Sequence, residues 1–301
     1  MFEQFLIQLE ASPAFLLSVV TVLSLMVGSF LNVLIYRLPV MMKTEWECDC
    51  RELLADELKN KESSKNKKVM KEPEPFNLVK PDSHCPSCKA KVKPWQNIPV
   101  VSYLLLKGRC GNCGASISWR YPAIELLTAL ASFVVAWQFG YSAQTLVLVP
   151  VTWVFIALIF IDIDHMLLPD QLTMPLLWLV LLSSVWGVFS SPKDALIGAT
   201  AGYLSLWTVY WCFKLLTGKE GMGYGDFKLL AVVGAVVGWI KLPMVILLSS
   251  GVGALIGLGL MVVGKAKRSS AIPFGPYIAI AGWIAMIWGE PILHWYLGVL
   301  A

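Results

Sequence analysis

Acidic side chains stand at two places where long apolar runs begin or end, and carboxylates in such places can do acid–base chemistry. Asp162 and Asp164 follow one apolar run, and Asp226 follows Gly223 and Gly225 at the start of another. Ionisable groups in or beside membrane segments are costly, so a functional role is the first explanation to consider. Glycine has no Cβ and lets another chain approach closely, so the motif would present Asp226 at an open place.

Two carboxylates that meet can share one proton, because like charges about 3 Å apart cannot both be ionised. The neutral acid can then polarise a carbonyl group while the anion activates water, which is the chemistry of an aspartic protease. An isolated acid at the end of a span would merely face water. The Gly-x-Gly before Asp226 favours the catalytic interpretation, with Asp162 and Asp164 as competing candidates for its partner.

Ion- or proton-coupled membrane transport is the main alternative, since carboxylates between broken helices also bind protons and cations. Such a transporter predicts acids near mid-membrane and traces of internal repeats. The acids here lie at the ends of apolar runs, and the two halves of the chain share no evident pattern. A serine nucleophile is disfavoured too, because none of the three histidines accompanies a Gly-x-Ser-x-Gly motif.

Four of the seven cysteines form two C-x2-C pairs, Cys85 with Cys88 and Cys110 with Cys113. This spacing is close to that by which four thiolates surround one tetrahedral Zn²⁺, whereas two disulfides or incidental thiols are the alternatives. Four protein ligands leave no position open for a substrate. We therefore predict a structural zinc ion that stabilises a small module.

The remainder of the chain is apolar enough to hold these groups in a membrane. Its 301 residues are 57% hydrophobic with a mean hydropathy of +0.67, which excludes a soluble protein of ordinary composition. The first 14 residues carry two Glu and no Lys or Arg, so we do not expect a cleavable signal peptide. We expect an α-helical polytopic membrane protein with about eight transmembrane helices, near 15–38, 121–139, 146–161, 172–189, 195–216, 227–239, 242–263 and 272–297.

The boundary at 239–243 leaves a count of seven open, but the distribution of basic residues favours eight. The insert 40–120 holds 15 of the 24 Lys and Arg, and another basic cluster lies at 265–268. The positive-inside rule places both in the cytoplasm, and with eight spans the two acidic sites face the same side. That compartment is reducing, which favours zinc over disulfides.

These observations divide the chain into three parts. We expect an amino-terminal transmembrane helix at 1–39, a cytoplasmic zinc-binding module at 40–120 between the first and second helices, and a membrane peptidase domain at 121–301.

The sequence resembles the type IV prepilin peptidases, which are bifunctional leader peptidases and N-methyltransferases. The similarity runs over nearly the whole chain and includes both cysteine pairs. Its other motifs are GSFLNV at 28–33, YRLP at 36–39, NIPVVSY at 97–103, RYP at 120–122, DID at 162–164, LPD at 168–170, GYGD at 223–226 and PFGPY at 273–277.

The resemblance implies a Gly-x-Gly-Asp membrane aspartic protease with Asp162 and Asp226 as its catalytic pair and with Asp164, Gly223 and Gly225 in supporting positions. Such an enzyme cuts the basic leader of type IV prepilins and type II secretion pseudopilins after a Gly. It acts on the cytoplasmic side of the bacterial inner membrane. It then methylates the new amino terminus with S-adenosylmethionine, and no nucleic-acid partner is expected.

Methyl transfer in that family is associated with the amino-terminal module and with a Gly-Lys pair before the third cysteine. The corresponding pair here is Gly108 and Arg109. Arginine keeps the charge of lysine but not its geometry. The resemblance thus implies Gly108 and Arg109 as residues of the methyl-donor site.

Overall fold

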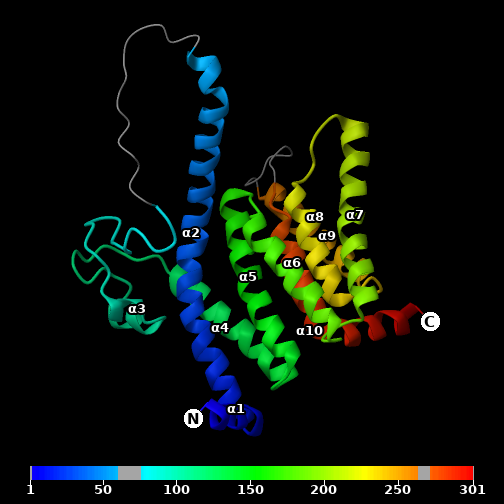
Figure 1. Cartoon of the computed structure of the whole chain (residues 1–301), viewed down its shortest axis with the longest axis horizontal. Coiled ribbons are helices and arrows are strands. Elements are labelled where there is room, and N and C mark those ends of the chain that lie inside the picture. Colours follow the sequence, from blue (N-terminus) through cyan, green and yellow to red (C-terminus); the bar gives the residue numbers. More distant parts are fainter. Residues whose placement is uncertain (1, 60–75, 264–271, 301) are drawn as a thin grey trace.

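The computed structural model describes residues 2–59, 76–263 and 272–300. These residues form ten α-helices and one 3-10 helix, without a named strand (Figure 1). In chain order the elements are α1 Phe2–Ala11, α2 Pro13–Lys59, η1 Pro94–Asn97, α3 Val101–Leu105, α4 Arg120–Phe139, α5 Ala143–His165, α6 Asp170–Val185, α7 Pro192–Thr217, α8 Tyr224–Val237, α9 Leu242–Val262 and α10 Gly275–Leu300. The predicted helical fold class is confirmed.

Six helices of the described part are long and apolar enough to cross a membrane, namely α2, α4, α5, α7, α9 and α10. The chain is therefore a multi-pass membrane protein. Helices α6 and α8 coincide with the two other predicted spans but have only 16 and 14 residues. The total of eight spans stays a prediction, and the basic cluster at 265–268 lies outside the described residues.

The uncertain boundary after α8 is a true break between two helices. Gly238 has a φ of 77°, a conformation that favours glycine, and it ends α8 before α9 begins at Leu242. The apolar residues on either side of 238–241 thus belong to separate helices.

Helix α2 is longer than the predicted first span. It runs for 47 residues and continues through Pro39 to Lys59. Proline removes one backbone hydrogen bond, but the Met, Lys, Glu and Leu residues that follow are good helix formers and continue the helix. The proposed domain boundary at 39 therefore falls within a helix.

Close contact between α7 and α8 places α8 inside the bundle. A Cβ added to Gly198 of α7 would lie 2.1 Å from the carbonyl oxygen of Gly234 on α8. Small residues of this kind let membrane helices approach closely. Almost every residue of α8 from Asp226 to Val237 is buried, so the helix that carries Asp226 is held from all sides (Figure 1).

A second apolar cluster packs α2 and α4 against α5. In the same region a Cβ at Gly28 of α2 would lie 2.8 Å from Cα of Glu125 on α4. The side-chain amide of Asn32 donates to the carbonyl oxygen of Tyr121 over 3.2 Å. The residues 76–119 that precede α4 form a loop-rich module beside α2 (Figure 1).

Candidate active site and metal-binding cluster

Asp162 lies in the last turn of α5 and is only 5% exposed. Met166 caps the end of α5, and its backbone N–H donates to the carbonyl oxygen of Asp162 over 2.8 Å. The backbone N–H of Gly275, the first residue of α10, donates to Oδ2 of Asp162 over 3.1 Å. The positive end of the α10 dipole thus faces this carboxylate.

Asp226 lies in the first turn of α8 and is 7% exposed. Its Oδ1 atom is buried without a hydrogen-bond partner among the described residues, which is uncommon for a buried polar atom. Leu168 packs against both Gly225, the residue before Asp226, and Gly275, whose N–H binds Asp162, so the two carboxylates lie in one region. The structure therefore brings together two predicted residues that are far apart in the sequence.

Leu168 packs between the first turns of α8 and α10. A Cβ on Gly225 would lie 2.6 Å from Cβ of Leu168, and a Cβ on Gly275 would lie 3.0 Å from its Cδ1. The same Cβ on Gly275 would lie 2.7 Å from Oδ2 of Asp162. Both glycines are thus required for the starts of α8 and α10 to lie this close to the end of α5.

Gly223 differs from Gly225. Its φ of −86° is open to any residue. A Cβ there would come no closer than 3.9 Å to another atom, and the nearest side-chain atom is Oδ2 of Asp226. The fold does not require glycine at 223, and the space beside the Asp226 carboxylate stays free because Gly223 fills none of it.

The two other acids near Asp162 and Asp226 form ion pairs with basic side chains. Asp164 accepts two hydrogen bonds from Arg120, one of them 3.0 Å between Nη1 and Oδ1, and the guanidinium lies over the ring of Phe160. Each carboxylate oxygen of Asp170 lies 2.7 Å from Nζ of Lys228. These pairs join α4 to α5 and α6 to α8, so Asp164 and Asp170 are suited to positioning helices.

The four cysteines also come together. Their Sγ atoms all lie within 4.8 Å of one another, and those of Cys85 and Cys113 are 3.8 Å apart. A tetrahedron with Zn–S bonds of about 2.3 Å has edges of about 3.8 Å, so this donor set fits one zinc ion. The Asn112 side-chain amide donates to Sγ of Cys88, which lowers the pKa of this thiol and favours the metal-binding thiolate.

The two cysteine pairs have the same backbone structure. Cys85 and Cys110 each exchange backbone hydrogen bonds with the residues four and five positions further on. The residues four positions on, Lys89 and Gly114, both have positive φ, at 58° and 72°. Because the same turn occurs in both pairs, the two thiols of each C-x2-C pair lie close together.

Gly108 and Arg109 lie directly before the second pair. Gly108 has a φ of 66°, and a Cβ there would lie 2.9 Å from the hydroxyl oxygen of Tyr103, so the packing of the module requires glycine. Arg109 is exposed, and its backbone forms a bridge with Ser116. Their role at a methyl-donor site stays a prediction.

Glu125 and Arg37 attach the module to the membrane helices, a role that the sequence analysis did not assign to either residue, although Arg37 lies in the YRLP motif. Glu125 of α4 is 8% exposed and accepts the backbone N–H of Val100 over 2.7 Å. Val100 has a φ of 59°, which is rare for a β-branched residue and indicates that the surrounding structure holds it. The sequence could have pointed to Glu125 and Arg37 only through their charge, because charged residues in or at the end of apolar runs are costly and often functional.

These features place the chain in a class of multi-pass membrane proteins that have two neighbouring buried carboxylates and an attached four-cysteine module. Family comparison is more specific. The model of the Bacterial Peptidase A24 N-terminal domain matches residues 22–139, and that of the Type IV leader peptidase family matches residues 149–258. The chain belongs to the type IV leader peptidase family.

Full-length relatives agree with this assignment. A "Prepilin leader peptidase/N-methyltransferase" of Aeromonas salmonicida is 52% identical over 288 residues, which cover 96% of each chain. A protein of the same name from Pseudomonas aeruginosa is 52% identical over 91% of this chain and 91% of its own. Another from Legionella pneumophila is 46% identical over 95% of this chain and 96% of its own. No solved structure matches significantly. The resemblance seen in the motifs is confirmed, and the transporter alternative receives no support.

Proposed function

We propose that this enzyme removes the leader peptide of type IV prepilins and type II secretion pseudopilins and then N-methylates the new amino terminus with S-adenosylmethionine. The main supporting observation is that Asp162 and Asp226 are both buried, at helix ends that pack together around Leu168, in a chain of the leader peptidase family. Zinc at the four-cysteine cluster is structural in this proposal.

In the proposed mechanism Asp162 and Asp226 share one proton, because two neighbouring buried anions would repel each other. The ionised carboxylate takes a proton from water as its oxygen attacks the scissile carbonyl carbon. The neutral carboxylic acid donates its proton to the carbonyl oxygen. The tetrahedral intermediate then collapses, the C–N bond breaks, and the departing amine takes up a proton.

Membrane geometry is consistent with a prepilin substrate. Asp162 lies in the last turn of α5 and Asp226 in the first turn of α8, so both lie near ends of apolar helices. A substrate helix in the bilayer would present its leader junction at that depth, where the helix must unwind for water to attack the peptide bond. By the positive-inside rule this end faces the cytoplasm, and we propose the bacterial inner membrane as the location.

We propose that the three parts of the chain have different roles. Residues 1–39 supply the first membrane helix, 40–120 the zinc-binding module associated with methyl transfer, and 121–301 the peptidase. The two aspartates lie in the last part and the four cysteines in the second. Gly108 and Arg109 are proposed to contribute to methyl transfer from the second part.

Incubation of the purified chain with a prepilin, with and without S-adenosylmethionine, tests the function. We expect leader removal in both reactions and a mass increase of one methyl group on the mature pilin only with the methyl donor. Mass spectrometry of the pilin measures both outcomes. An intact leader after incubation with the folded protein would contradict the peptidase assignment. Pilin that is cleaved but not methylated in the presence of S-adenosylmethionine would contradict the transferase assignment.

The two glycines of the motif should respond differently to alanine. Gly225→Ala forces Leu168 to move, so we expect it to lower the melting temperature by several degrees, as for a loss of about 1–3 kcal/mol. Gly223→Ala should keep the melting temperature but reduce leader cleavage, because the new methyl group occupies free space beside Asp226. Thermal unfolding and a cleavage assay of both variants check this. Equal stability loss in both would show that Gly223 is also a packing residue.

A further inference from the structure

A cavity of about 430 Å³ lies between α2 and the zinc-binding module. Its walls come from Phe30, Val33 and Arg37 of α2, from the segment 78–83, and from residues after the first cysteine pair. The volume is within the range of about 300–1,000 Å³ that is typical of small-molecule sites. Apolar and polar side chains share the lining, which suits a ligand with one apolar and one charged end.

Two opposite charges stand in the wall of this cavity. Nζ of Lys91 lies 2.9 Å from Oδ2 of Asp82. The hydrogen bond between them lowers the pKa of Asp82 and raises the pKa of Lys91, so both are charged near neutral pH. Their side chains are 64% and 79% exposed, and an exposed pair of this kind contributes little to stability. The pair can therefore open to accept a ligand.

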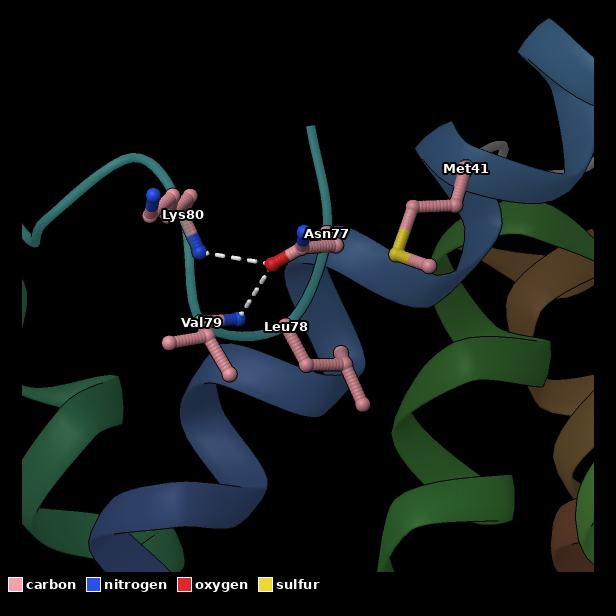
Figure 2. A pocket seen from close by; sticks show the side chains of 5 residues that line it. All are labelled: Met41, Asn77, Leu78, Val79 and Lys80. Carbon is pink, nitrogen blue, oxygen red and sulfur yellow. Dashed lines mark hydrogen bonds between the residues drawn. The ribbon is translucent and has the colours of Figure 1, made fainter. Parts of the chain in front are cut away.

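Arg37 also lines the cavity, but it holds the backbone of the segment 77–81 in place. Its guanidinium is buried and donates to the carbonyl oxygens of Asn77 and Pro81, over 2.8 Å and 2.6 Å. Figure 2 shows how Asn77 Oδ1 in turn accepts the backbone N–H groups of Val79 and Lys80. These bonds fix the segment 77–81, which lines both this cavity and a neighbouring hollow at Met41.

The cavity lies at the same turns of α2 that pack toward the candidate active site. Phe30, Val33 and Arg37 face the cavity, whereas Leu34 and Leu38 belong to the apolar cluster that contains Ile161, the residue before Asp162. Leu78 lines the cavity and also packs against that cluster, so the cavity and the cluster adjoin.

We propose that this cavity is the binding site for S-adenosylmethionine, an inference that rests on the proposed methyl-transfer function. Gly108 and Arg109 do not line it, so in this proposal they do not bind the methyl donor directly. The methionine part of this molecule carries a carboxylate and an ammonium group, which match Lys91 and Asp82. Its flat adenine ring matches the apolar side of the cavity at Phe30, which is 48% exposed. Asn97 and Ser83 supply neutral hydrogen-bonding groups.

Methyl transfer from this site balances without a further reagent. The unprotonated amino group of the cleaved pilin attacks the methyl carbon, an N–C bond forms, and the S–C bond breaks. The sulfur keeps the electron pair and becomes a neutral thioether, and the methylated nitrogen releases a proton to water.

Direct binding to the purified full-length chain tests the proposal. Isothermal titration with S-adenosylmethionine, and separately with the unreactive S-adenosylhomocysteine, should give at least tenfold weaker affinity for Asp82→Asn and for Lys91→Gln. The double exchange of Asp82→Lys with Lys91→Asp restores the ion pair but reverses its direction, so its affinity should stay low. Zinc content reports whether each variant keeps the module folded.

Glu47→Gln is the matched control, because Glu47 and Arg51 form an exposed ion pair on α2 away from the cavity. Its affinity should equal that of the unchanged chain. Normal affinity in both single variants, or recovery in the exchanged pair, would overturn the site while leaving methyl transfer intact. A chain that neither binds S-adenosylmethionine nor methylates cleaved pilin would overturn the methyl-transfer function and the site together.

Discussion

Asp162→Asn and Asp226→Asn should each abolish leader removal, with rates about 10³-fold or more below that of the unchanged enzyme. Asparagine keeps the size of aspartate and can still accept the N–H of Gly275 at position 162. It cannot exchange a proton with water or substrate, so the chemistry fails while the helix ends stay in place. The double variant should be little worse than either single one, because the two acids act as a unit.

Asp164→Asn and Asp170→Asn are the matched controls, since they remove carboxylates from the same region. Each loses a charged partner, Arg120 or Lys228, at the surface of the helix ends. We expect less than about tenfold loss of cleavage, because exposed ion pairs contribute only about 0–1 kcal/mol. Prepilin processing at matched protein levels separates the variants. Near-normal cleavage by Asp162→Asn together with none by Asp164→Asn would move the catalytic role to Asp164, and activity in Asp226→Asn would end the aspartic-protease mechanism.

The choice between Asp162 and Asp164 shows where sequence alone stops. The two acids stand two residues apart at the end of one apolar run, and local pattern treats them alike. The structure distinguishes them through residues distant in the chain. Arg120 pairs with Asp164, and the start of α10 binds Asp162 through Gly275. The motifs supplied the candidates, but the partners depend on how the helices pack.

The cysteine cluster was more accessible to prediction. A C-x2-C pair is a local structure, and its turn brings two thiols together wherever it forms. The predicted meeting of all four sulfur atoms is confirmed by their mutual distances. The attachment of the module was not predictable in the same way. It depends on the carboxylate of Glu125 and the backbone of Val100, 25 residues earlier, in a conformation that valine seldom adopts.

Helix positions were also accessible, whereas their ends were less so. Each apolar run corresponds to a helix, but α2 continues 20 residues beyond Pro39, since its charged residues are good helix formers. The importance of Gly225 could be seen from the motif, and its cause could not. Leu168, which makes glycine necessary there, belongs to a loop 57 residues earlier.

Loss of zinc should abolish methylation far more strongly than it affects cleavage. We expect about one Zn²⁺ per purified chain, and the Cys85→Ser, Cys113→Ser double variant should lose it. Zinc in small modules contributes about 10–16 kcal/mol of apparent binding free energy, which exceeds what a loop-rich segment can supply without it. The part of the chain that carries Lys91, Asn97 and Arg109 should then unfold.

Cleavage should survive this loss, because the helices that carry Asp162 and Asp226 have their own support. The apolar cluster around α8 contains residues of the membrane helices and their connections and none of the four cysteines. Elemental analysis, limited proteolysis of the module and mass spectrometry of the pilin product measure the three effects. Cys212→Ser is the matched control, since Cys212 is a free, exposed thiol on α7 and should leave the metal content unchanged. Full zinc occupancy in the double cysteine variant would remove the metal site. Equal loss of cleavage and methylation would mean that the contacts of Arg37 and Glu125 with the module also hold the peptidase site together.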